Sequence, residues 1–435
     1  MAMVVKNNMS AISTLNTLNK NSSALSKSLQ KVSSGMKINS AADDASGYAI
    51  SERMRVQIRS LDQDKANTQN GSSMMKVAEG AVSSSVEILK TLKEKVVNAA
   101  NDTNTDADRQ TIQKELDQSI DQINDNANVT FNGQYLVDGS HNSKVTQTTT
   151  ALTNQSLAAT TTSSTAITDL TNRNSEKLNI HSTDTVTLSY VKQGKTYTSS
   201  MAVGTNQLSE IFSKLGSDAL EMTTANTNTS FIGLDASGNS VYTASGQSAI
   251  SVTAKSSGTD GQVSGLTVSI TDNTGKVNKS ANAVLDAFSE SVRAQNTSAD
   301  NAIVLQIGTK ASQSIKAGLT DMRAVALGLQ GTDGSTLNVS TREKANAAIN
   351  VLDTAVQKAL DQQTTIGSIE SRLEYTASNL TTASENVTAS ESTIRDADMA
   401  KEMTEYTKNN VLLQAAQSML AQANQNSSSV LSLLK

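Results

Sequence analysis

Apolar residues recur every seven positions at both ends of the chain. In the last 27 residues, where no charge occurs before Lys435, they fall on two parallel lines. The members of these lines are Leu413, Leu420, Leu434, Ala416, Ala423 and Val430. A helix with such a seam, and with neutral Gln, Asn and Ser on its other faces, needs a partner because an apolar seam is stable only when it is covered.

The first 38 residues carry a matching pattern. Their heptad lines are Leu18, Leu25, Val32, Leu15, Leu29 and Met36. The two terminal segments can therefore pair as a coiled coil. Because so short a pair buries little area, we expect neighbouring subunits to complete the burial. We interpret the ends as self-assembly helices with the contact residues Leu15, Leu18, Leu25, Leu29, Val32, Leu413, Leu420, Ala423, Val430 and Leu434.

A further heptad pattern predicts one long helix from the mid-forties to about residue 100. At about 1.5 Å per residue this helix would be roughly 80 Å long, and Gly71 and Gly80 should weaken it locally. The polar stretch NDTNTDAD ends it. Thr105 with Asp108 then forms a capping box for a second, shorter helix that folds back on the first.

The C-terminal half repeats this arrangement. Ser340 and Glu343 form a capping-box pair, and from Ala345 to Val387 apolar residues alternate steps of three and four. The pattern predicts a second rod of similar length. No Pro occurs anywhere in the chain, so the usual helix breaker is missing from both rods.

Strand signals are confined to shorter segments. VTFNGQYLVDGS predicts a small hairpin around its Asn-Gly turn, and IVLQIGTKASQSIKAGLTDM (303–322) predicts another. From about 140 to 285 the composition shifts to Thr, Ser, Asn and Gly. There TVTLSYV and TYTSSMAV flank KQGK as a hairpin, AISVTA and LTVSIT are further strands, and LSEIFSKL is one short helix. The Thr-rich start, roughly 144 to 172, is partly irregular by the same criteria.

The fold class is therefore mainly α. Both chain ends form long antiparallel coiled-coil rods, with small β-hairpins and an inserted β-rich (α+β) outer domain. The expected divisions are an N-terminal assembly helix with connector (1–42), N-terminal rod helices and hairpin (43–140), the variable β-rich insert (141–285), a C-terminal hairpin and rod (286–395) and a C-terminal assembly helix (396–435).

Composition excludes several functions. Apolar residues make up 37% and aromatic residues 3%, which argues against one large core. The absence of Cys excludes disulfides, thiol nucleophiles and the common structural zinc sites. A net charge of -5 does not indicate a nucleic-acid-binding protein. The Asn, Gln and Ser residues of the C-terminal segment would make its insertion into a membrane energetically unfavourable. No N-terminal secretion signal is visible.

Candidate chemistry is sparse. His141 and His181 have no second ligand nearby, so we interpret both as surface residues and expect no metal and no cofactor. The acidic pairs Asp43–Asp44 and Asp396/Asp398 stand at helix starts, where carboxylates complement the helix dipole. The basic N-terminal segment lacks the aromatic residues of a nucleic-acid arm. The insert has neither an HExxH pair nor a GxSxG elbow, so no catalytic residue and no enzyme is predicted.

Long motifs at both ends resemble bacterial flagellin. SLQKVSSGMKINSAADDASGYAISERM (28–54) resembles its N-terminal signature, and FNGQYLVDG resembles its FNG turn. STIRDADMAKEM and LLQAAQSMLAQANQNSSSVLSLLK resemble its C-terminal signature. The resemblance covers roughly 1–140 and 285–435, and the insert matches nothing that can be named.

The resemblance implies an extracellular structural subunit that polymerises with copies of itself into the flagellar filament for motility. It also implies unfolded export through the flagellar type III apparatus. The implied partners are an export chaperone, a cap and hook-filament junction proteins, without nucleic acid or membrane insertion. A hook-filament junction protein and a secreted adhesin stay as alternatives, and the insert offers only acceptor chemistry for O-linked sugar.

A departure from the family concerns the host Toll-like receptor for flagellin. The positions that correspond to receptor contacts are Leu89, Thr91, Lys95 and Glu115. Strongly recognised flagellins present an arginine and then a leucine where this chain has Thr91 and Lys95, and only the glutamate is retained. Because a guanidinium fork and an apolar anchor are both missing, the resemblance implies weak signalling.

Overall fold

The computed structural model describes residues 8–216, 219–224, 231–243 and 248–433. The chain divides into two compact units. The first unit consists of 1–68, 306–313 and 375–435, and the second of 69–305 and 314–374. Because the units collect segments that are distant in sequence, the five predicted divisions, which follow chain order, stay a prediction.

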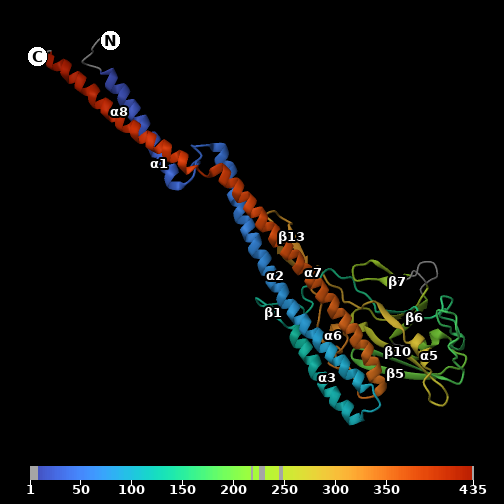
Figure 1. Ribbon diagram of the computed structural model, residues 1–435. Helices are drawn as coiled ribbons and strands as arrows, with labels where there is room; N and C mark the ends of the chain where they lie inside the picture. Colours follow the sequence, from blue (N-terminus) through green and yellow to red (C-terminus); the bar gives the residue numbers. More distant parts are fainter. Residues whose placement is uncertain (1–7, 217–218, 225–230, 244–247, 434–435) are drawn as a thin grey trace. The chain divides into compact units, whose positions relative to one another are not determined.

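The first unit contains the two terminal helices, which lie side by side in Figure 1. Helix α1 spans Met9–Ser34 and ends at Gly35. The φ of Gly35 is 70°, a left-handed conformation that glycine adopts without the strain that a Cβ would cause. Helix α8 spans Met399–Leu433. Its N-terminus is capped by Asp398, whose carboxylate accepts hydrogen bonds from the first backbone N–H groups.

Two long helices run through both units, as predicted. Helix α2 spans Ala45–Ala99 and α7 spans Arg342–Arg395. Asp44 caps α2 by accepting from the backbone N–H groups of Ser46 and Gly47. Gly71 does not interrupt α2, and a Cβ there would meet the Leu305 side chain at 2.7 Å, so close packing explains this glycine.

The predicted capping box at the start of the second rod is wrong. The hydroxyl of Ser340 donates to the Asn338 side chain instead of capping the helix. Thr341 takes the cap position, and its Oγ1 accepts from the N–H of Lys344 at 3.4 Å. The helix therefore begins one residue later than predicted, with Thr341 rather than Ser340 as its cap.

Helix α3, Asp106–Ala127, lies beside α2 in the second unit (Figure 1). Its predicted capping box between Thr105 and Asp108 is present, and the hydrogen bonds from Thr105 lower the pKa of Asp108. Buried Arg109 closes the turn between the helices by donating to the carbonyls of Ala99 (2.9 Å) and Asn101 (3.0 Å). These bonds satisfy carbonyls that the end of α2 leaves unpaired.

Three predicted hairpins are present. Strands β1, Thr130–Phe131, and β2, Gln134–Tyr135, meet at an Asn-Gly turn whose two residues both have positive φ. Strands β12, Ile303–Gln306, and β13, Ser314–Ala317, pair as the second. Strands β4, Thr185–Lys192, and β5, Lys195–Ala202, form the third.

The strand-rich region of the second unit contains two larger sheets. One has the strand order β10-β4-β5, and the other has the order β11-β3-β9-β6. A separate ribbon pairs β7 with β8. The remaining strands are β3 Ala151–Asn154, β6 Leu220–Thr224, β7 Phe231–Leu234, β8 Ser240–Tyr242, β9 Ile250–Ala254, β10 Val263–Thr271 and β11 Phe288–Val292.

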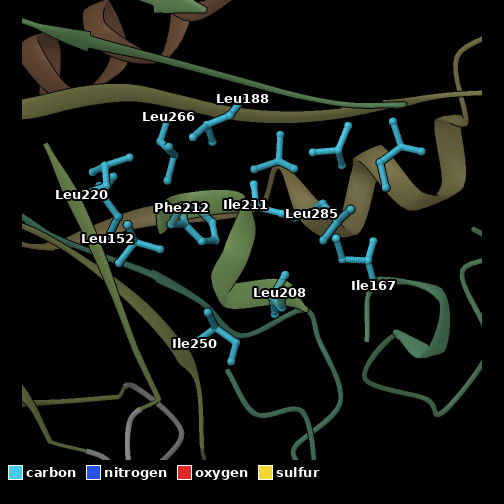
Figure 2. Packing of buried hydrophobic residues seen from close by; sticks show 14 of the residues in the cluster. Leu152, Ile167, Leu188, Leu208, Ile211, Phe212, Leu220, Ile250, Leu266 and Leu285 are labelled. Carbon is cyan, nitrogen blue, oxygen red and sulfur yellow. The ribbon is translucent and has the colours of Figure 1, made fainter. Parts of the chain in front are cut away.

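A hydrophobic core packs the two sheets of this region around short helices (Figure 2). Phe212 and Ile211, from a wide helical turn after α4 (Leu208–Glu210), insert among side chains from strands of both sheets. Helix α5, Lys279–Leu285, contributes Leu285. The other helices are α6, Ala324–Leu327, and the 3-10 turns Ile167–Asp169 and Thr259–Gly261.

Candidate assembly surface at the chain ends

The terminal helices α1 and α8 pair in antiparallel fashion. The amide of Asn21 donates to the Leu412 carbonyl (3.2 Å), and the amide of Asn409 donates to the Ser28 hydroxyl (3.0 Å). Residue numbers thus rise along α1 as they fall along α8. Hydrogen bonds of this kind lie at the edges of the apolar seam. They fix the register of the two helices more than they strengthen the pairing.

The predicted heptad lines divide between covered and exposed positions. The partly covered positions facing the partner helix are Leu18, Leu25, Val32, Leu413, Leu420 and Ala423, and Ala416 is buried. Leu15 and Leu29 remain 45% and 51% exposed. A pair of helices covers only one narrow stripe on each member, which explains why the second line of α1 is left open. The predictions at the Val430 side chain and at Leu434 fall outside the described residues.

Further exposed apolar side chains extend this surface and were missed in the sequence. On α1 Met9 is 69% exposed, and on α8 Met419 is 62% exposed. The other members are Ile12, Met399, Met403, Val411 and Leu412. Leu412 and Met419 are seven residues apart, so a third heptad line on α8 could have predicted this part of the exposed apolar surface. We call these residues, together with Leu15 and Leu29, the terminal apolar surface.

Charge on the terminal pair is one-sided. Helix α1 and its flanks carry lysines without an acidic residue through position 42, whereas α8 is uncharged from Asn409 to Ser432. Lys31 Nζ lies 3.5 Å from Glu402 Oε1, and both side chains are partly exposed. An ion pair in water-accessible surroundings contributes about 0–1 kcal/mol, so the apolar seam dominates the pairing.

The receptor-contact positions lie in the second unit. Leu89 is fully buried, so its assignment as a contact is corrected: no receptor could reach this side chain in the folded chain. Thr91 is exposed and its hydroxyl donates to the Glu87 carbonyl. Lys95 Nζ lies 3.1 Å from Glu115 Oε1, which engages the one retained contact residue in an ion pair between α2 and α3.

The other candidate residues have local roles. Asp43 accepts from the N–H of Ser40, and this hydrogen bond holds its pKa below the usual value. His181 Nδ1 lies 3.8 Å from the carboxylate of Asp184. Among the described residues no cluster of three or more His, Cys, Asp or Glu side chains could hold a metal ion. Within the same residues no helix has the length and hydropathy of a membrane crossing.

Comparisons with known proteins match both ends of the chain. The family described as bacterial flagellin N-terminal helical region matches residues 5–142, and the bacterial flagellin C-terminal helical region matches 349–434. A flagellin of Clostridium tyrobutyricum is 34% identical over 97% of this chain and 99% of its own length. A flagellin of Bacillus subtilis is 32% identical over the full length of both chains.

A solved structure of the flagellar junction protein of Legionella pneumophila is a more distant match. It is 15% identical, covers 74% of this chain and 99% of its own, and has a TM-score of 0.30. That similarity is too low to assign the chain to a junction protein.

Proposed function

We propose that the terminal apolar surface is the polymerisation surface of this chain. The chain belongs to the bacterial flagellin family and is a structural subunit of the flagellar filament. The supporting observation is that α1 and α8 cover one seam between them and still expose large apolar side chains, including Leu15, Leu29 and Met419. About half of each side chain is already covered in the monomer, so complete burial by a partner would contribute roughly 1 kcal/mol for each.

The arrangement favours a polymer over a closed dimer. Apolar positions recur along most of the length of both terminal helices, from Met9 to Leu29 on α1 and from Met399 to Met419 on α8. A contact that joins different surfaces of successive copies repeats without closing, which produces a helical filament. The terminal pair would be marginal on its own, so burial between copies would stabilise the fold and the polymer together.

Removal of the ends tests this proposal. Seeded polymerisation of the full chain is compared by electron microscopy with a variant lacking 1–38 and 409–435. We expect filaments from the full chain only. Filaments from both proteins would place the polymerisation surface elsewhere, and filaments from neither under any seeded condition would contradict the proposal as a whole.

A finer variant separates the terminal apolar surface from general folding. The double substitution Leu15→Ser with Leu29→Ser changes exposed side chains, so the monomer should stay folded while the critical concentration for polymerisation rises at least tenfold. Val277→Ser is the matched control, because Val277 is exposed in the second unit. An unchanged critical concentration in the double variant would remove these leucines from the surface.

The remaining assignments follow from family membership. The subunit would leave the cell unfolded through the flagellar type III apparatus and act in the extracellular filament. Its partners would be an export chaperone for the C-terminal helix, a cap, and hook-filament junction proteins. The protein would serve a structural role without catalysis, because the polymer function uses apolar surface and no reactive group. The exposed apolar residues of α8 would give the chaperone a surface to cover before export.

Weak recognition by the host Toll-like receptor is a further part of the proposal. Thr91 and Lys95 offer neither a guanidinium fork nor an apolar anchor, and Glu115 is already paired with Lys95. A receptor would have to break that ion pair before using the glutamate. Both effects reduce the affinity that this face of α2 and α3 can provide.

A further inference from the structure

Exposed methionines gather on the terminal helices. Among the described residues, the methionines with exposed side chains are Met9, Met399, Met403 and Met419, and their exposed fractions range from 44% to 69%. All of them lie on α1 or α8 and belong to the terminal apolar surface. The other described methionines, in either unit, are half-buried or buried. We call these residues of α1 and α8 the exposed methionines.

The exposed methionines lie at both ends of the terminal helix pair. The side-chain amide of Asn8 donates to the Ala423 carbonyl at 3.1 Å, which places Met9 and Met419 at the same end of the pair. The other two stand in the first two turns of α8, at the opposite end. A chemical change at these sulfurs would therefore alter the surface along most of its length.

The thioether of methionine is the most readily oxidised group in this chain. The sequence contains 13 Met, no Cys and no Trp, so no thiol competes for an oxidant. Between Asn409 and Ser432 helix α8 has no titratable side chain, so a change of pH leaves this stretch unchanged. Oxidation, in contrast, converts a flexible apolar side chain into a polar sulfoxide.

We propose that the exposed methionines are an oxidation site for peroxides, and that their oxidation prevents the soluble subunit from polymerising. In this step the O–O bond of hydrogen peroxide breaks. One oxygen forms a bond to the thioether sulfur, and the other leaves with both hydrogens as water. The sulfur loses the two electrons that the peroxide gains. The inference rests on the proposed function, because it requires the terminal apolar surface to be the polymerisation surface.

The sulfoxide acts through the burial of a polar group. Its oxygen is a hydrogen-bond acceptor that water satisfies in the soluble subunit, and covering it between copies without a donor is unfavourable. In a filament the sulfurs of unmodified subunits would already be covered, so the peroxide would act on subunits that have not yet assembled. A methionine sulfoxide reductase reverses the change: two thiols become a disulfide, and the oxygen leaves as water.

Peptide mass spectrometry after treatment with hydrogen peroxide tests the chemistry. In the soluble full-length chain, sulfoxide should form at the exposed methionines at least tenfold faster than at Met74, Met75 and Met322, which are at most 6% exposed. In seeded filaments under the same treatment, the rates at the exposed methionines should fall at least tenfold. Equal rates at exposed and buried positions of the soluble chain, or equal rates in subunit and filament, would overturn the inference.

The critical concentration for seeded polymerisation tests the consequence. It should rise at least tenfold when the wild-type subunit is oxidised, with an unchanged circular dichroism spectrum. Methionine sulfoxide reductases of both stereospecificities, supplied with dithiothreitol, should restore the original value. An unchanged critical concentration, a loss of helical signal or a failure of the reductases to restore polymerisation would each contradict the inference.

Two variants locate the effect. For each protein the critical concentration after peroxide is divided by its own value before peroxide, so a direct effect of the substitutions on polymerisation cancels. This ratio should stay near one when leucine replaces the exposed methionines, and it should equal the wild-type ratio when two half-buried methionines of the second unit are replaced. The first variant carries Met9→Leu, Met399→Leu, Met403→Leu and Met419→Leu, and the control carries Met201→Leu and Met222→Leu. Equal ratios in both variants would overturn the inference, and if the first does not fold, the restoration by the reductases decides.

The double substitution Leu15→Ser with Leu29→Ser separates this inference from the proposed function. If it raises the critical concentration and peroxide does not, the oxidation site is wrong and the polymerisation surface stands. If neither raises it, both are overturned. An effect of peroxide alone supports the oxidation site and removes only the two leucines from the surface.

Discussion

At the scale of single residues, hydroxyl groups cap the starts of α3 and α7. The box between Thr105 and Asp108 is present as predicted, because its two partners are three residues apart and nothing else competes for them. The box predicted at Ser340 is wrong, because Thr341 occupies the cap position and its hydroxyl accepts from the Lys344 N–H. Two adjacent hydroxyl residues can each cap a helix, so the local sequence does not determine which of them is used.

Glu290 gives a prediction for pH dependence. Its Oε2 accepts from Arg293 Nε at 3.3 Å, Oε1 is buried without a partner, and burial raises its pKa above 4.5. The folded state then binds more protons than the unfolded state above about pH 4.5, so the stability contributed by this group is lost as pH rises through the folded-state pKa.

Replacing this carboxyl by an amide should remove the dependence. The free energy of unfolding of the wild type minus that of Glu290→Gln should fall as pH rises from 4 to 8, measured by urea unfolding. Glu374→Gln, at an exposed position of α7, is the control and should show a flat difference. A difference that rises with pH would contradict the stated sign.

At the scale of elements, the turn of the β4–β5 hairpin depends both on its own sequence and on a contact with a distant loop. Gln193 and Gly194 both have positive φ, as the KQGK sequence predicts for a two-residue turn. The tertiary part was not predictable: a Cβ on Gly194 would lie 2.4 Å from the Ser335 carbonyl oxygen. The same glycine therefore serves the turn and the packing of a distant loop.

Two glycine substitutions separate these roles. Gly275 also has positive φ, 84°, but a Cβ there would meet nothing within 4 Å. Gly275→Ala should cost about 1–2 kcal/mol for the left-handed backbone alone. Gly194→Ala should cost at least 1 kcal/mol more, because the loop backbone must move. Urea unfolding followed by circular dichroism measures both, and equal losses would show that the contact with Ser335 has no energetic effect.

At the scale of the whole molecule, recognition by the host receptor depends on residues from two helices. The double substitution Thr91→Arg with Lys95→Leu introduces the guanidinium and the apolar anchor and also releases Glu115 from its ion pair. Potency in a receptor reporter assay should rise at least tenfold over the wild type.

Two further proteins control this test. Adding Glu115→Ala to the double variant should reverse the gain, whereas Lys90→Leu, at an exposed lysine of α2, should leave potency near the wild-type value. Wild-type potency equal to that of a strongly stimulating flagellin would contradict the expected weakness at the outset.

The sequence by itself determined the elements of this protein and the family to which it belongs. Heptad lines predicted both terminal helices and both rods, and alternating residues around Asn-Gly and Gln-Gly turns predicted the hairpins. These signals act within a few residues, so they can be read without knowledge of the rest of the chain. The long terminal motifs carried the family resemblance that the relatives confirm.

Only the tertiary structure decided which surfaces are covered. Leu18 and Leu15 carry equivalent heptad signals, yet α8 covers the line of Leu18 and leaves Leu15 exposed. Leu89 is buried and Lys95 is paired with Glu115 for the same reason: neighbouring elements, not local sequence, determine exposure. A cavity lined by Asp138 and Lys358 likewise requires segments more than 200 residues apart in the chain to meet, which no local pattern encodes.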